Sequence, residues 1–290
     1  MSKIVRALSE DGSVLCAAVC SKDIVNEIFR IHKTTPVASA ALGRLATAGV
    51  IMGSLMKNES DSLTLRLDGG GPSGIITVAA DYKGNVKCCA NHYNVDLPLN
   101  PQGKLDVAGY VGRNGLLGVI RDTGLKEPYT AQIPLVSGEI AEDITSYYAV
   151  SEQIPTVCAL GVLVDRDWSI KAAGGYLIQL VPPVDESKID FIENNIKKMQ
   201  SITELLNSGM TAREVALLGL EGLNGHVLDE WDVYYKCDCS REKTEGLLVS
   251  LGKEELKKIG DDGEKIEVCC HFCDEKYYFE PDEIYRLITE

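Results

Sequence analysis

The chain has 290 residues, of which 45% are hydrophobic, so it is long enough for two domains with packed cores. Its 29 basic and 43 acidic residues give a net charge of -14, which argues against general nucleic-acid binding, because that function needs lysine and arginine at the phosphates. No stretch approaches the roughly 18 consecutive apolar residues of a membrane helix, and the N-terminus lacks the apolar core of a signal peptide. We therefore expect a cytoplasmic protein that binds neither nucleic acid nor membrane.

Residues 1–182 have the pattern of an α+β domain with antiparallel sheets and packed helices. Alternating apolar and polar residues predict strands, and apolar residues at helical spacing predict helices. The glycines at 69–71 do not lead into a helix, so they indicate a hairpin turn rather than a phosphate cradle. The expected strands are 3–9, 13–19, 62–68, 74–80, 86–92, 116–121, 156–164 and 170–181. The expected helices are 22–32, 35–56 and one that Ser137 opens, with Ile140, Ile144, Tyr148 and Val150 on its apolar face.

Residues 183–230 form a predicted helical linker. Apolar residues recur at helical spacing along one stripe, at Ile189, Ile192, Ile196 and Met199. Two capping boxes, 201–204 and 211–214, start two further short helices. The linker is either a set of helices packed permanently on the first domain or a segment of marginal stability. In the second case its apolar stripe must be covered by another part of the protein or by a partner.

Residues 231–290 form a predicted small third part with 9 basic and 16 acidic residues. Apolar runs occupy 231–235 and 247–251, a short helix occupies 254–259 and ends at Gly260, strand-like runs occupy 266–268 and 277–279, and a last helix starts at 280. About 60 residues are few for an independent core, so a metal staple is expected.

Two cysteine pairs supply the ligands for that metal. Cys237 and Cys239 form a C-x-C pair, and Cys270 and Cys273 form a C-x-x-C pair after a gap of thirty residues. Four thiolates match the tetrahedral set that zinc prefers in structural sites, so we expect one zinc ion per chain. The site would carry a formal charge of -2, which Lys236, Arg241 and Lys243 could partly offset. The same thiolates are also nucleophiles that oxidants attack, so the cluster could be a structural clip, a redox sensor or both.

The ligand assignment has one close competitor. Cys269 stands next to Cys270, but Cys270 gives the two-residue spacing to Cys273 and is favoured for that reason. His271 also lies within reach, although four cysteines already complete a tetrahedron.

The other cysteines and the histidines indicate no enzyme. Cys16, Cys20, Cys88, Cys89 and Cys158 lie in apolar strand-like runs and are interpreted as small buried hydrophobic residues. The histidines are widely scattered, and no cysteine or serine has a recognisable histidine and carboxylate partner. We assign no catalytic residue.

Motifs along nearly the whole chain resemble those of the 33 kDa heat shock protein family, the redox-regulated chaperonins of bacteria. The resemblance rests on both cysteine pairs and on the segments 38–44, 69–74, 102–107, 136–143, 151–155 and 173–176. Cys269 is the departure from the family pattern and puts the second disulfide partner in question.

The resemblance implies a holdase chaperone that is inactive when it is reduced and zinc-bound. Oxidation would join Cys237 to Cys239 and Cys270 to Cys273, release zinc and unfold the C-terminal domain and then the linker. Unfolding client proteins would bind the exposed apolar surface, and the oxidised form would be a homodimer. The rival hypotheses are a zinc-ribbon adaptor that binds a macromolecular partner constitutively and a thiol-disulfide oxidoreductase. The second rival lacks a thioredoxin-like setting around Cys270.

Overall fold

The computed structural model describes residues 1–289. These residues form two compact units, one from Met1 to Lys236 and one that begins at Cys237. The predicted α+β class is confirmed, because each unit combines helices with antiparallel strands. The first unit includes the expected linker, 183–230, and the residues 231–236 that follow it. The three-part division therefore stays a prediction about how the parts behave during function.

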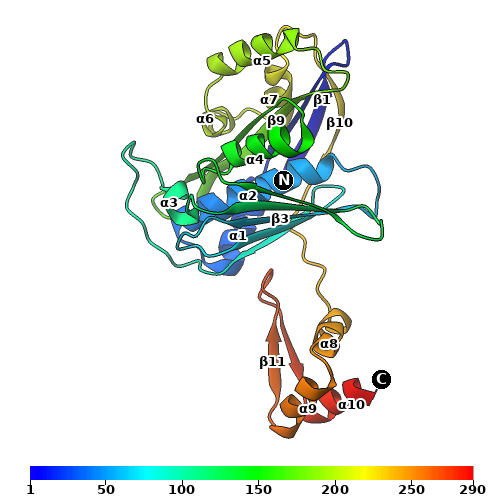
Figure 1. The fold of residues 1–290 in the computed structure, drawn as a ribbon. Coiled ribbons are helices and arrows are strands. Elements are labelled where there is room, and N and C mark those ends of the chain that lie inside the picture. Colours follow the sequence, from blue (N-terminus) through cyan, green and yellow to red (C-terminus); the bar gives the residue numbers. More distant parts are fainter. Residues whose placement is uncertain (290) are drawn as a thin grey trace. The chain divides into compact units, whose positions relative to one another are not determined.

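The first unit contains two five-stranded sheets and seven α-helices (Figure 1). Its strands are β1 (Lys3–Leu8), β2 (Val14–Cys20), β3 (Ser62–Asp68), β4 (Ile76–Asp81), β5 (Val86–Ala90), β6 (Leu116–Asp122), β7 (Tyr129–Pro134), β8 (Thr156–Val164), β9 (Ile170–Leu180) and β10 (His226–Asp232). Its helices are α1 (Lys22–His32), α2 (Pro36–Ser54), α3 (Val107–Val111), α4 (Ala141–Tyr147), the π-helix η1 (Tyr148–Glu152), α5 (Ser187–Lys198), α6 (Ile202–Asn207) and α7 (Ala212–Gly219).

The two sheets share one apolar core around α2. Sheet A has the order β10-β1-β2-β9-β8, and sheet B has the order β5-β4-β3-β6-β7. Successive strand residues point to opposite faces, so Ile4 of β1 joins the core around α2, whereas Val5 and Ala7 face the other side of sheet A. Helix α2 is long and apolar enough to cross a membrane, but 94% of that stretch is buried inside the protein. Its position in this core accounts for its apolar sequence.

Helices α5–α7 cover the second face of sheet A and bury the predicted stripe. Ile192 is 5% exposed, and Ile202 and Leu205 are similarly buried against strand residues such as Tyr176 and Ile178. Both capping boxes form, because the Ser201 hydroxyl accepts from Glu204 N at 3.3 Å and the Thr211 hydroxyl accepts from Glu214 N at 3.3 Å. The linker helices are therefore packed on sheet A in this structure.

The chain from 226 to 236, here called the edge segment, pairs with both sheets of the first unit. Its β10 part runs antiparallel to β1. Beyond β10, Tyr235 forms a parallel bridge with Val86 of β5, and Lys236 N donates to Val86 O at 2.8 Å. The edge segment therefore covers one edge of each sheet, which the apolar run at 231–235 did not predict.

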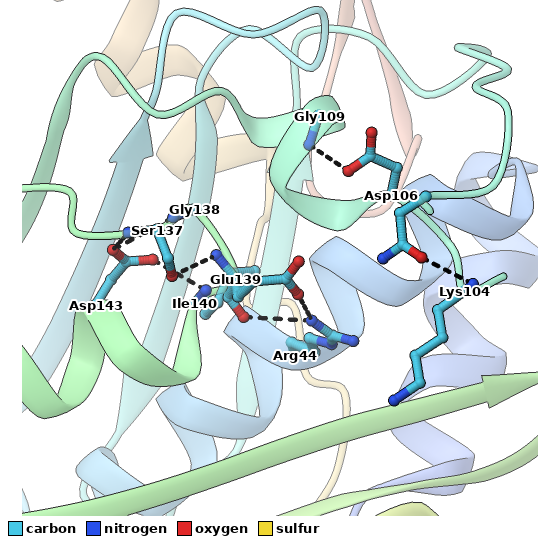
Figure 2. Close-up of polar contacts among 10 residues, drawn as sticks. Arg44, Lys104, Asp106, Gly109, Ser137, Gly138, Glu139, Ile140 and Asp143 are labelled. Atoms are coloured by element: carbon cyan, nitrogen blue, oxygen red, sulfur yellow. Dashed lines mark hydrogen bonds and ion pairs between the residues drawn. The ribbon is translucent and has the colours of Figure 1, made fainter. Parts of the chain in front are cut away.

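Three of the segments that carry the family resemblance lie close together (Figure 2). They are 38–44, which is part of α2, 102–107 and 136–143. Arg44 of α2 donates to a carboxylate oxygen of Glu139 at 2.6 Å. The buried Asp143 carboxylate accepts from the backbone N–H groups of Val136 at 2.7 Å and Ile140 at 3.0 Å. Ile140 has a φ of 75°, which is costly for a β-branched residue, so Asp143 holds this loop in a strained conformation.

Replacing Asp143 by asparagine is expected to lower the free energy of unfolding of the first unit by about 3 kcal/mol. Both oxygens of the buried carboxylate now accept hydrogen bonds from backbone N–H groups. In asparagine one of these oxygens is replaced by an NH2 group, which cannot accept such a bond. Urea unfolding measures the change. The neighbouring Glu142→Gln is the control, because Glu142 is exposed and its replacement should change stability by only a few tenths of a kcal/mol. Equal effects of the two substitutions would contradict this role for Asp143.

The second unit is small. It contains α8 (Arg241–Ser250), α9 (Lys253–Asp261), a two-stranded sheet of β11 (Ile266–Cys269) and β12 (Lys276–Phe279), and α10 (Pro281–Thr289). Only four side chains of this unit are buried hydrophobic residues among those described, namely Leu248, Leu256, Phe279 and Ile284. Packing alone therefore offers this unit little stabilisation.

Several predictions of local structure were wrong. The apolar run at 247–251 lies mostly in helix α8, and α9 continues through Gly260 to Asp261 instead of ending before it. Val150 is 64% exposed, because the wider turn of η1 shifts the apolar face after Tyr148. The first helical residue after the Ser137 loop is Ala141. Strands β7 and β10 and helix α3 were not predicted.

Candidate metal centre

The four predicted ligands lie on two short segments of the second unit. Cys237 and Cys239 precede α8, whose first turn is capped by the Ser240 hydroxyl, which accepts from Lys243 N at 3.2 Å. Cys270 and Cys273 lie in the turn between β11 and β12. That turn is closed by Cys270 N, which donates to Glu275 O at 2.9 Å, and by Asp274 N, which donates to Cys270 O at 2.9 Å.

The structure brings the four sulfurs together. The ligand atoms of Cys237, Cys239, Cys270 and Cys273 all lie within 4.8 Å of one another. The Sγ atoms of Cys237 and Cys270 are 3.7 Å apart, and those of Cys239 and Cys273 are 3.4 Å apart. All ten cysteines of the chain are free thiols in this structure.

These distances fit a tetrahedral zinc site. With zinc–sulfur bonds of about 2.3 Å, the sulfurs of a regular tetrahedron are about 3.8 Å apart. The two sulfur–sulfur distances of 3.7 Å and 3.4 Å are close to that spacing. A soft all-thiolate donor set also favours zinc over magnesium or calcium. The residues present therefore fit one zinc ion.

The surroundings of three of these thiols shift their pKa values in different directions. Burial, together with hydrogen bonds to neighbouring thiols, raises the pKa of Cys237 and of Cys273, although backbone N–H donors from Cys239 and Glu275 act in the opposite direction. Burial also opposes ionisation of Cys239, but hydrogen bonds from Tyr277 and the neighbouring thiols lower its pKa. Four adjacent thiolates need a cation among them, which is what a divalent metal supplies.

The competitor Cys269 lies outside the cluster. It ends β11, where it pairs with Lys276, and its Sγ is 4.0 Å from Cys270 O. His271 is exposed and does not belong to the group of four. The geometry therefore selects Cys270 for the cluster.

The charged neighbours differ from expectation. Arg241 pairs with Glu283 at 2.7 Å and stacks on Phe279 at 4.4 Å, and Lys243 pairs with Asp238. Both cations are thus neutralised by carboxylates, so the prediction that they offset the thiolate charge is not supported. Tyr277 was not predicted as a site residue, but its hydroxyl lies 3.2 Å from Cys239 Sγ and donates a hydrogen bond to it. Its position in the aromatic run just after Cys273 was the only available signal.

The remaining thiols belong to the first unit. Cys16 and Cys88 are fully buried, as predicted, whereas Cys20, Cys89 and Cys158 are partly buried. Burial raises the pKa of Cys16 and of Cys158 to about 12 and raises that of Cys88. These three thiols stay protonated at neutral pH and are poor targets for oxidants.

Comparison with known proteins gives one consistent result. The family described as Hsp33 protein matches residues 2–280. A 33 kDa chaperonin of Clostridium acetobutylicum is 47% identical over 287 residues, which are 99% of this chain and 97% of that protein. A 33 kDa chaperonin of Clostridium tetani is 44% identical over 286 residues, with the same coverage of 99% and 97%.

A solved structure is similar over nearly the same length. The crystal structure of the 33 kDa chaperonin from Thermotoga maritima, described as a heat shock protein 33 homolog, superimposes with a TM-score of 0.89 at 36% sequence identity. The match covers 99% of this chain and 97% of that chain. Fold and sequence therefore point to the same relatives across both units.

Proposed function

Because the chain belongs to the Hsp33 family, we propose that it is a molecular chaperone, and more specifically a holdase that oxidation activates. The observation that supports the redox part is the cluster of four sulfurs within 4.8 Å of one another. That cluster lies in a unit with only a small apolar core, so the state of the thiols can decide whether the unit is folded.

In the reduced state, Cys237, Cys239, Cys270 and Cys273 would hold one zinc ion as thiolates. When bound, the ion would supply the positive charge that allows four thiolates to lie together and would join the two cysteine segments. Tyr277 stabilises the Cys239 thiolate by its hydrogen bond of 3.2 Å. In this proposal the inactive state of the protein is therefore the one in which the second unit is folded and binds the metal.

Oxidation would remove two electrons from each pair of zinc-bound thiolates, and the oxidant would take up these electrons together with two protons from solvent. With hydrogen peroxide as oxidant, one peroxide is reduced to two waters for each disulfide formed. The proposed disulfides are Cys237–Cys239 and Cys270–Cys273. All pairings of these sulfurs start within 4.8 Å, so the family resemblance supports this choice rather than the geometry. A disulfide sulfur is a poor zinc ligand, so zinc would leave.

Loss of zinc would remove the main stabiliser of the second unit, whose unfolding would free the chain beyond Lys236. We propose that the linker helices α5–α7 then leave sheet A and uncover apolar surface for unfolding client proteins. The surface buried between them includes Ile178, Ile202, Leu205 and Val215. In this proposal the active form is a cytoplasmic homodimer that performs no catalysis, and the net charge of -14 keeps the exposed apolar surface soluble.

The test is to treat the reduced, zinc-loaded protein with hydrogen peroxide under mild heating. We expect release of one zinc ion per chain, stronger binding of a hydrophobic dye and suppressed aggregation of a chemically denatured client. A reductant with zinc should reverse all three changes. Peptide mapping of the oxidised protein identifies the disulfide partners, and a Cys237–Cys270 or Cys239–Cys273 crosslink would contradict the proposed pairing.

Two other outcomes would count against the proposal. Retained zinc with unchanged client aggregation would remove the redox switch. Client or partner binding that is equally strong in the reduced protein would favour a constitutive zinc-ribbon adaptor instead.

A further inference from the structure

A groove of about 820 Å³ lies in the first unit, away from the thiols. It is formed by β1, the end of α2, the turn between β4 and β5, and the edge segment. Its volume is in the range of roughly 300–1,000 Å³ that small-molecule sites occupy. The lining residues that carry charge are Arg6, Lys57, Lys83, Asp232 and Lys236, and the aromatic ones are Tyr82, Trp231, Tyr234 and Tyr235.

The groove is basic in a protein that is strongly acidic. Four of its five charged residues are cationic, although the whole chain has a net charge of -14. Arg6 is already engaged, because its Nε donates to Asp229 at 2.8 Å and its guanidinium stacks on Trp231 at 5.0 Å. Lys57 and Lys236 are exposed and form no ion pair within residues 1–289. A cleft lined by cations focuses a positive potential that attracts anions.

The aromatic walls are held in place by backbone groups. Trp231 Nε1 donates to Lys83 O at 2.7 Å, and the Tyr235 hydroxyl donates to Cys88 O at 3.0 Å. The backbone N–H of Tyr234 donates to Asn85 Oδ1 at 3.1 Å, which fixes the main chain while the side chain stays 49% exposed. An ordered but open aromatic ring is a surface on which a planar ligand can stack.

We propose that this groove binds a small anion that carries an aromatic ring, of the chemical class of nucleoside di- and triphosphates. The ammonium groups of Lys57, Lys83 and Lys236 would bind the phosphates, and Tyr234 would stack on the base. The overall charge of -14 disfavours a long polyanion, so a mononucleotide fits better than a nucleic acid. This binding goes beyond the proposed chaperone function and does not depend on the state of the cysteines.

The chain offers a fluorescent reporter for the test. It contains two tryptophans, so Trp168→Phe leaves Trp231 in the groove wall as the single emitter. Titrating this reduced full-length protein with ADP should give a saturable change in fluorescence. Inorganic tripolyphosphate, which lacks the base, should bind about tenfold more weakly, since stacking of one base on an aromatic side chain contributes that much.

Charge-matched variants locate the site. The double variant Lys57→Gln, Lys83→Gln should weaken ADP binding about tenfold or more, as expected for two lost phosphate contacts. The control Lys22→Gln, Lys126→Gln removes the same charge from exposed positions outside the groove and should leave binding unchanged. Tyr234→Leu should reduce binding of ADP but not of tripolyphosphate. Thermal unfolding of each variant verifies that it folds.

The proposal is overturned by any of four results. These are no saturable change with ADP, equal loss in the two double variants, equal affinity for tripolyphosphate and ADP, and tighter binding of a single-stranded oligonucleotide or a polyglutamate peptide than of ADP. Because the measurement uses reduced protein and no client, its failure leaves the redox proposal untouched.

Discussion

Replacing Cys273 by serine is expected to unfold the second unit while the first unit stays folded. The substitution removes one of four sulfurs that lie within 4.8 Å of one another. Structural zinc contributes roughly 10–16 kcal/mol of apparent free energy in small zinc peptides, and a serine hydroxyl is a poor substitute ligand. The apolar core of this unit, built around Phe279 and Leu256, is too small to replace that contribution.

Hydrogen exchange followed by peptide with mass spectrometry measures the effect, together with the zinc content. Peptides from 237–289 should lose protection, and peptides from α2 and β9 should keep it. The matched control is Cys269→Ser, one residue from the cluster, which should retain zinc and protection because Cys269 lies outside the group of four. If Cys269→Ser loses zinc as completely as Cys273→Ser, Cys269 is a ligand and the assignment of Cys270 is wrong.

Replacing Ile202 by alanine is expected to produce client protection in the reduced protein. Ile202 is 4% exposed and packs α6 against sheet A, where Gly161 leaves room for its side chain. Truncating a buried isoleucine in this way costs about 2–5 kcal/mol. Since α6 is a short helix that depends on this packing, the loss should raise the population of molecules in which the linker helices have left the sheet.

The readouts are hydrogen exchange of residues 201–223 and aggregation of a denatured client in the presence of reductant. Val150→Ala is the control, because it removes the same kind of methyl groups from a side chain that is 64% exposed. Faster exchange in α6 and α7 without any client protection would show that the apolar face of sheet A is not the client surface.

Much of the fold could be predicted because it depends on local patterns. The capping boxes at 201–204 and 211–214 form with the expected hydrogen bonds, since N-cap geometry is set by residues that are close in the sequence. Strand β10 was missed because its partner β1 lies at the other end of the chain. The exposure of Val150 follows from the π-helix η1, which a regular helical period does not anticipate.

The candidate site was predictable to a similar degree. Ligand spacing is a local property, so the sequence identified the four cysteines that the structure brings together. The choice between Cys269 and Cys270 depends on where β11 ends, which is a matter of tertiary structure. The hydrogen bond from Tyr277 and the carboxylate partners of Arg241 and Lys243 depend on side-chain directions that the spacing does not determine.

The edge segment has a consequence for how the protein can be shortened. A chain that ends at Lys236 retains a partner for the outer edge of β1 and for that of β5. A chain that ends at Val181 loses both partners together with the helices over sheet A, and it presents two unpaired strands beside an apolar face. Such edges recruit strands from other molecules. The smallest fragment able to remain monodisperse therefore includes residues 226–236, however independent the first 182 residues look in the sequence.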